Sequence, residues 1–385
     1  MLIDWWEIGD EQNLRINPKE LDLLYKIIIK KYRSLYNFTK NLPYSSGSLY
    51  TKLKYKGQGI TVALLKKILY KLDIPLEKIG NLPIKVGKRK LIEAKFPIEI
   101  DPPLGQVLAN AFFDGYADDY IMRYSNYDPE IRREFRLSIT NAIKGAKVPI
   151  NKPENIERDI DLPVFIPKLL KSLWRVSTFL GDKCRIPKQF IQLVKQEKKW
   201  GWYFLKGAYL DEGTISGGEV LILTGIKNRL LVEDTQKLAK ILGLSTKIRE
   251  KKARKGYYEL KLKASSVEKF YKNISNLYFT KVGKWKRVSE ILKRQKILKK
   301  RLQKIKEDYK KILRVCRKKG KITISEIKKI CGLPESTAYF RVNLLVYTQN
   351  LEKRNERKNE YICKNEKLPS PLPTINEMRR RFGWR

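Results

Sequence analysis

Two segments with the same unusual pattern lie in the middle of the chain, and they constrain its fold more than any other feature. They cover residues 104–115 and 202–213, and each is an apolar stretch with small residues that ends in acidic residues and glycine. Strand-like sequence and a second helical segment follow each of them. Aligning Leu108 with Leu205 brings the two into register. A repeated helix–strand–strand–helix unit of this size predicts a duplicated α+β domain with a pseudo-twofold axis.

The two expected helices have the residues that close side-by-side packing requires. Bulky side chains hold helix axes about 8–10 Å apart, so a close pair needs small residues along its seam. Gly207 and Ala208 on one helix, and Ala109 and Ala111 on the other, are the expected seam residues. Each helix then brings a carboxylate to the axis at its C-terminus, where the helix dipole disfavours negative charge. A cation between the carboxylates relieves this repulsion, and Mg²⁺ suits such a site because it binds a few carboxylates, waters and substrate phosphates.

The segment 205–213 (Leu-Lys-Gly-Ala-Tyr-Leu-Asp-Glu-Gly) resembles the motif of the LAGLIDADG homing endonuclease family over its full length. Residues 185–191, 223–243 and 257–263 resemble the segments that flank this motif in the family. The resemblance extends over roughly residues 104–290. It implies an α+β fold with a duplicated LAGLIDADG-type αββαββα core in two halves, 104–200 and 201–290. The core would form a basic saddle over double-stranded DNA and hydrolyse phosphodiester bonds with Mg²⁺.

The resemblance also implies site residues. In the second motif, Glu212 is the expected catalytic carboxylate and metal ligand, and Asp211 beside it is a further catalytic candidate. The first motif departs from the pattern, because its register places Gly115 at the ligand position. Asp114 is then the first choice of ligand, and a shifted register offers Asp118 or Asp119. If this half has lost its ligand, nicking or DNA binding without cleavage replaces double-strand cleavage.

A basic residue near the carboxylates would neutralise charge that develops on the scissile phosphate. The candidates are Lys261, Lys263 and Lys284.

The charge of the chain indicates a polyanionic partner. There are 83 Lys and Arg against 41 Asp and Glu, which gives a net charge of +42. Such an excess repels itself unless a polyanion relieves it, and basic side chains gain affinity for nucleic acid by releasing counterions. A lysine-rich thermophile surface is the alternative, but it predicts a closer balance of Glu with Lys. Double-stranded DNA is the expected partner, and the charge does not separate DNA from RNA.

Residues 1–80 are expected to form a helical DNA-binding domain. A helix, a tight turn, a short basic helix capped by Ser46 or Ser48, a turn and an amphipathic helix follow one another, in an order that resembles the helix-turn-helix of Cro/C1-type repressors. The second helix of such a unit enters the major groove. The residues expected to face DNA are Ser46, Ser48, Tyr50, Thr51, Lys52, Lys54 and Lys56. The alternative is a small helical bundle with a basic face.

The C-terminal part is expected to contain a basic helix at 291–319 and a winged-helix-like domain at 320–366. The helix that starts at Glu335 is the candidate recognition helix, with a charged hairpin after it as the wing. The residues expected to meet DNA are Ser336, Thr337, Tyr339, Arg341 and Asn343. A protein-binding winged helix is the alternative. Residues 81–103 are interpreted as a connector and 367–385 as a proline-containing tail.

Composition excludes several kinds of site. The chain has no histidine, so His-based triads, His-metal nuclease sites and Cys2His2 zinc fingers are excluded. Its four cysteines, Cys184, Cys316, Cys331 and Cys363, show no Cys-x-x-Cys spacing. We find no long apolar run and no signal peptide, so a monomeric cytoplasmic protein without a membrane segment is expected. No cofactor other than the metal is expected.

Three functions follow from these observations. The first is a free-standing, metal-dependent, site-specific DNA endonuclease of homing type, since intein features are absent from both ends. The second is a cleavage-deficient transcriptional or chromosomal regulator, which resembles the sporulation regulators that join a degenerate core of this family to a helix-turn-helix. The third is RNA binding, such as assistance in intron splicing.

Overall fold

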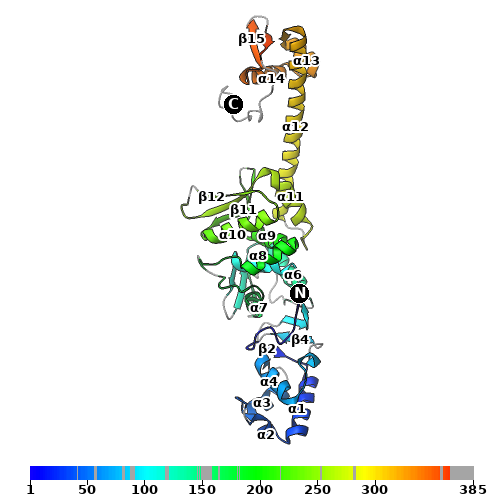
Figure 1. Cartoon of the computed structure of the whole chain (residues 1–385), viewed down its shortest axis with the longest axis vertical. Helices are drawn as coiled ribbons and strands as arrows, with labels where there is room; N and C mark the ends of the chain where they lie inside the picture. Colours follow the sequence, from blue (N-terminus) through cyan, green and yellow to red (C-terminus); the bar gives the residue numbers. More distant parts are fainter. Residues whose placement is uncertain are drawn as a thin grey trace. The chain divides into compact units, whose positions relative to one another are not determined.

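The computed structural model describes residues 1–40, 42–55, 59–79, 83–86, 92–117, 121–144, 146, 148, 158–163, 165–179, 181, 183–216, 218–251, 254–280, 283–355 and 359–364. The chain mixes helices and strands and divides into two compact units, Met1–Glu290 and Ile291–Arg385 (Figure 1). None of the described helices combines the length and the apolar character that crossing a membrane requires.

The N-terminal part combines a small helical group with a four-stranded antiparallel sheet in the order β3-β2-β4-β5. Its elements are β1 (Leu2–Ile3), β2 (Asn13–Arg15), α1 (Pro18–Tyr32), α2 (Leu35–Thr39), α3 (Ser46–Lys54), β3 (Ile60–Thr61), α4 (Val62–Leu72), the short 3₁₀ helix η1 (Leu76–Ile79), β4 (Pro83–Val86), β5 (Ile92–Lys95) and β6 (Ile98–Glu99).

Two expectations for this part are corrected. The region 81–103 contributes strands, because β4 and β5 continue the sheet that β2 begins and β6 pairs with β1. The cap of α3 is Ser45 rather than Ser46 or Ser48, because the Ser45 hydroxyl accepts a hydrogen bond from the Ser48 amide at 3.1 Å. Strands separated along the chain supply each other's backbone partners here, and this pairing is not visible in local periodicity.

The next part of unit 1 begins with a short buried helix and continues as a three-stranded antiparallel sheet in the order β7-β8-β9. Asp128 caps the helix after β8, where it accepts a hydrogen bond from the Glu130 amide, and Pro129 occupies the first helical position. The elements are α5 (Leu104–Phe112), β7 (Gly115–Ala117), β8 (Ile121–Ser125), α6 (Pro129–Ala142), β9 (Asp159–Pro163), α7 (Phe165–Trp174) and α8 (Lys188–Gln196).

The last part of unit 1 shows the same succession of a buried helix, two strands and a helix. Its sheet is antiparallel in the order β10-β11-β13-β12. The elements are α9 (Lys198–Glu212), β10 (Thr214–Ser216), β11 (Glu219–Ile226), α10 (Arg229–Ile241), β12 (Thr246–Glu250), β13 (Tyr258–Leu262) and α11 (Ala264–Ser275). Strands and a second helix therefore follow α9, as the sequence predicts for this half.

Helices α5 and α9 pack against each other along a seam of small residues. A Cβ atom on Gly207 would lie 2.9 Å from the Ala109 Cβ and 2.9 Å from the carbonyl oxygen of Gln106. A Cβ atom on Gly105 would lie 2.6 Å from the carbonyl oxygen of Trp200. These distances are too short for any side chain, so the backbones approach as closely as glycine permits. Gly207 and Ala109 were expected at this seam, and Gly105 is added to them.

A fully buried ion pair joins α9 to α6. The Lys206 ammonium donates to the Glu134 carboxylate and to the carbonyl oxygen of Leu277. Glu134 also accepts hydrogen bonds from the amides of Phe279 and Thr280. Burial lowers the pKa of Lys206 to about 8, and the charge of Glu134 opposes this shift. Because both charges are buried and satisfied, removing either partner would leave an uncompensated charge in the core.

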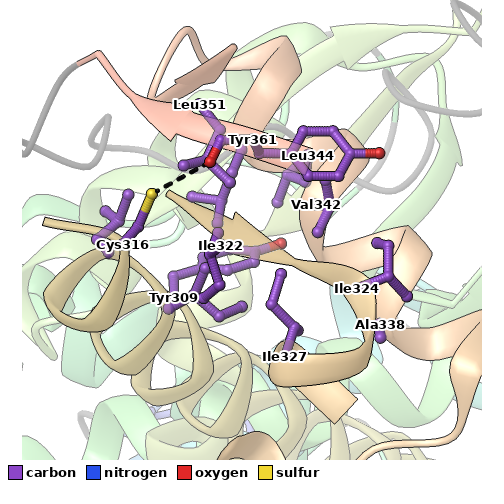
Figure 2. Close-up of a cluster of buried hydrophobic side chains, with 13 residues drawn as sticks. Tyr309, Cys316, Ile322, Ile324, Ile327, Ala338, Val342, Leu344, Leu351 and Tyr361 are labelled. Carbon is purple, nitrogen blue, oxygen red and sulfur yellow. Dashed lines mark hydrogen bonds between the residues drawn. The ribbon is translucent and has the colours of Figure 1, made fainter. Parts of the chain in front are cut away.

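The C-terminal unit has its own hydrophobic core (Figure 2). A capping box between Thr323 and Glu326 starts α13, and Gly332 ends it in the left-handed conformation at φ 60°. The thiol of Cys316 donates to the Tyr361 carbonyl oxygen at 3.6 Å. The elements are α12 (Gly283–Lys319), which begins in unit 1, then β14 (Ile322–Thr323), α13 (Ile324–Cys331), α14 (Glu335–Tyr347), β15 (Leu351–Asn355) and β16 (Glu360–Cys363), with the sheet order β14-β16-β15.

The close packing of α5 and α9 predicts that alanine destabilises the protein at Gly207 but not at Gly47. Gly207→Ala is expected to destabilise the protein by about 1–3 kcal/mol, because the new methyl group meets a backbone carbonyl that cannot move away cheaply. Gly47→Ala is the matched control, since nothing lies within 4 Å of a Cβ at this position in α3. It should stabilise by about 0.5–1 kcal/mol. Chemical denaturation measures both, and equal effects of the two substitutions would contradict the close seam.

Candidate functional site

The ends of α5 and α9 bring three carboxylates together. Asp211 and Glu212 are the last two residues of α9, and Asp114 follows α5 by two residues. All three are half-buried. Gly213 must follow them, because a Cβ at that position would lie 2.2 Å from the Tyr209 ring. The close seam thus places the two helix ends, and their acidic residues, at one point.

Asp211 is held by residues of α5 and β8. One carboxylate oxygen accepts from the Asn110 amide group of α5 at 2.8 Å, and the other accepts from the Tyr124 hydroxyl of β8 at 2.7 Å. Burial, together with the negative charge of Asp114, raises the pKa of Asp211 well above its usual range. With both oxygens engaged, Asp211 ties the end of α9 to α5 and β8.

Asp114 is oriented by Asn126, whose amide group donates to one carboxylate oxygen at 2.8 Å. Asn126 is itself placed by two backbone contacts. Its side-chain oxygen accepts from the Asp128 amide at 2.9 Å, and its carbonyl oxygen accepts from Arg132 at 2.6 Å. Burial raises the pKa of Asp114 above its ordinary value.

Glu212 is the carboxylate that is least engaged. Burial, and then the charge of Asp114, raise its pKa to about 7. Within the described ranges, no side chain or backbone amide donates a hydrogen bond to it. Glu212 and Asp114 therefore lie close enough to repel each other, and together they offer carboxylate oxygens to a cation.

Lys284, in the first turn of α12, supplies the positive charge of the cluster. Its ammonium donates to the Leu210 carbonyl oxygen at 2.7 Å and lies 5.5 Å from the centroid of the Tyr209 ring. Burial lowers the pKa of Lys284, whereas the nearby carboxylates oppose this shift; they are Asp211, Asp114, Glu212 and Asp128.

The described side chains do not by themselves form a complete metal site. Among them, no group of three or more acidic or thiol side chains is arranged to hold an ion. Asp211 is engaged through both oxygens, which leaves Asp114 and Glu212. Mg²⁺ is commonly held by one or two carboxylates together with waters and substrate phosphates. The pair thus fits a metal whose remaining ligands come from water and nucleic acid.

The site residues expected from the sequence separate into three groups. Asp114, Asp211, Glu212 and Lys284 come together as described. Lys261 does not join them, because it pairs with Glu219 on the neighbouring strand. Lys263 is exposed at the start of α11, and Asp118 and Asp119 lie outside the described residues.

Sequence reasoning missed the neutral partners, which are Asn110, Tyr124 and Asn126. A local signal was Asn110, which with Gln106 is one of two buried amide side chains in the mostly apolar helix α5. A buried polar group of this kind needs a hydrogen-bond partner, and Asp211 is that partner.

The face of α3 that was expected to bind DNA is partly engaged within the protein. Ser48 and Tyr50 are exposed, whereas Ser46 and Thr51 are half-exposed. The Lys54 ammonium pairs with Asp22 of α1 at 2.6 Å. The Lys52 ammonium donates to the Gly59 carbonyl oxygen at 3.2 Å, and Lys56 lies outside the described residues.

On α14 the expectation for Arg341 is corrected. Its guanidinium donates to Asp308 of α12 at 3.1 Å, and both side chains are buried. The Tyr339 ring packs against the core of this unit. Ser336 is exposed and Thr337 and Asn343 are half-exposed, so these three retain access to a ligand. The sequence did not reveal that Arg341 is buried, because its ion-pair partner on α12 is distant in the chain.

The two faces of α14 predict different effects of substitution. Arg341→Ala should cost about 3–5 kcal/mol of unfolding free energy, because it leaves the buried Asp308 carboxylate without a partner. Asn343→Ala should change stability by no more than about 0.5 kcal/mol and should weaken DNA binding. Denaturation and fluorescence anisotropy with duplex DNA measure the two quantities. A stable Arg341→Ala protein with weakened DNA binding would restore the original assignment.

The raised pKa of Glu212 predicts a dependence of stability on pH. A carboxylate with a folded pKa near 7 and an ordinary unfolded value near 4.5 binds more protons when folded. Its contribution to stability therefore falls as the pH rises from 4.5 to 7. Relative to wild type, Glu212→Gln should gain up to about 3 kcal/mol between pH 5 and pH 8. Urea denaturation in chelator-containing buffer measures this difference, and an unchanged difference would contradict the shift.

Comparison with known proteins finds a family likeness in one segment of unit 1. Residues 202–275, which run from α9 to α11, match the family model of a LAGLIDADG-like domain. No curated protein matches the chain.

Two solved structures are similar to the chain. Variants of the homing endonuclease I-DmoI share 16% identity, with 45% of this chain and 94% of that chain covered at a TM-score of 0.32. Full-length DUF199/WhiA from Thermatoga maritima shares 12% identity, with 64% and 90% covered at a TM-score of 0.33. Asp211 and Glu212 fall inside the segment matched by the family model. The likeness to the LAGLIDADG-like domain family is thus located in residues 202–275.

Proposed function

We propose that the chain is a site-specific endonuclease of homing type that hydrolyses phosphodiester bonds of double-stranded DNA with a divalent metal. One observation carries this proposal. Asp114 and Glu212 lie at the ends of two closely packed helices, and the charge of Asp114 helps raise the pKa of Glu212. Two carboxylates held this close on a protein of net charge +42 favour a cation together with a phosphate ligand.

We further propose that unit 1 contains a duplicated core with a pseudo-twofold axis between α5 and α9. The order of elements supports this. A buried helix, two paired strands and a further helix follow one another in both halves, and β7-β8-β9 corresponds in order to β10-β11-β13. The proposed DNA surface is the saddle of these two sheets.

The flanking segments are proposed as additional DNA-binding modules, helix-turn-helix-like at 1–80 and winged-helix-like at 320–366. Their support is the order of short helices, and in the second case the hairpin β15–β16 that follows α14. The proposed contact residues are the expected ones whose side chains are exposed or half-exposed, namely Ser46, Ser48, Tyr50, Thr51, Lys52, Lys54, Ser336, Thr337, Tyr339 and Asn343.

In the proposed chemistry, Asp114 and Glu212 would hold Mg²⁺, which supplies an activated water and stabilises charge on the phosphate. Asp211 is a positioning residue, because its two hydrogen bonds keep the end of α9 against α5 and β8. Among the described basic residues, Lys284 is the one proposed to neutralise charge on the scissile phosphate.

A second function, DNA binding without cleavage, is favoured by specific features of the same site. The first motif has Gly115 in the register of the ligand. In addition, Lys284 already places a positive charge among the carboxylates. A regulator that uses the core as a binding scaffold needs no metal at this point.

Cleavage of a randomised plasmid library in Mg²⁺ or Mn²⁺ tests the proposal. Wild type is expected to cut or nick one target class, and Glu212→Gln and Asp114→Asn should each lower the rate by about a hundredfold or more. Glu290→Gln, an exposed carboxylate on α12, is the matched control and should keep full activity. Tight, salt-sensitive DNA binding without a cut in either metal would reject the endonuclease and support the second function.

A further inference from the structure

The first turn of α12 places a lysine at the end of α9, beside the acidic residues, and the surrounding contacts hold this turn firmly. The Gly283 amide donates to the Glu130 carboxylate of α6 at 2.9 Å. The neighbouring Trp285 ring stacks on Tyr271, with centroids 5.4 Å apart, and meets Tyr209 edge-on at 5.5 Å. Lys284 therefore comes from a fixed point of the core and not from a free side chain on the surface.

The segment before α12 is held by the buried ion pair of the core. Glu134 accepts hydrogen bonds from the amides of Phe279 and Thr280 and from the Thr280 hydroxyl. Lys206, which pairs with Glu134, belongs to the same helix as Asp211 and Glu212. The helix that carries the acids and the helix that carries Lys284 thus share one buried anchor.

The Lys284 ammonium lies where the C-terminal end of α9 needs a hydrogen-bond donor and a positive charge. The last carbonyl groups of a helix have no partner within the helix, and its C-terminus carries a partial negative charge. Lys284 donates to one of these carbonyls, that of Leu210, at 2.7 Å. The charges of all three carboxylates of the cluster also act on the Lys284 ammonium and favour its charged form. The Lys284 side chain thereby supplies both a positive charge and a hydrogen-bond donor at the point where the two helix ends repel each other.

We infer that Lys284 is a tethered counter-ion that occupies the role of a divalent metal in the DNA-free protein and competes with that metal for Asp114 and Glu212. The protein then keeps α5 and α9 together without metal and binds metal only weakly until a phosphate ligand is present. This inference rests on the proposed function for the identity of the competing ion, but it does not require that the protein cleaves DNA.

Titration of the DNA-free, full-length protein with Mn²⁺, followed by electron paramagnetic resonance, tests the competition. Lys284→Met should bind Mn²⁺ at least about tenfold more tightly than wild type, because an opposing positive charge within the site is removed. Lys286→Met is the matched control, since Lys286 is exposed two residues further along the same helix, and its Mn²⁺ affinity should equal that of wild type. Lys284→Arg keeps the charge and should also bind weakly.

A thermal melt provides a second readout. In chelator, Lys284→Met should melt at a lower temperature than wild type, and Mn²⁺ should restore most of the loss, whereas Mn²⁺ should barely shift the wild type. Lys284→Gln, which keeps a donor for the Leu210 carbonyl, serves the same titration if the Met variant does not fold. Mn²⁺ affinity that is equal in wild type and in both neutral variants would overturn the inference.

The cleavage assay separates this inference from the proposed function. A neutral variant that binds Mn²⁺ more tightly, in a protein that never cuts DNA, would support the counter-ion and reject the endonuclease. A wild-type protein that cuts DNA and already binds Mn²⁺ tightly through Glu212 would support the endonuclease and reject the counter-ion.

Discussion

The close approach of α5 and α9 is the constraint on which unit 1 depends. Glycine at 105 and 207 allows backbone atoms of one helix to touch the other, and no larger residue fits at either position. Because the helices are locked in this register, their C-terminal ends meet at one point. The acidic residues at those ends must then be accommodated together, although the helix dipoles and their mutual repulsion oppose it.

Polar partners drawn from the whole unit accommodate these acids. Asn110 and Tyr124 bind Asp211, Asn126 orients Asp114, and Lys284 contributes the positive charge. The protein itself thus supplies one positive charge and several hydrogen-bond donors to the cluster, while none of the described residues donates a hydrogen bond to Glu212.

Sequence reasoning succeeded where the pattern is local. The helix that ends at Glu212, the strands and helices after it, and the small residues Gly207 and Ala109 follow from periodicity and from the motif. It failed where a partner is distant in the chain. Arg341 forms an ion pair with Asp308, and Lys261 forms one with Glu219. Neither pair can be recognised from the spacing of residues along the chain. With lysine so abundant, the charge pattern alone did not single out Lys284 from Lys263.

The sequence by itself determined that the chain is strongly basic, that it mixes helices with strands, and that its two central helices end in acidic residues beside glycine. These are properties of composition and short-range pattern, which hydrophobic periodicity reports directly. Only the tertiary structure decided which carboxylate is tied down and which is free to act, and which lysine stands beside them. Those roles depend on burial and on hydrogen-bond partners up to about a hundred residues away, such as Asn110 for Asp211, and they arise only when the helices pack.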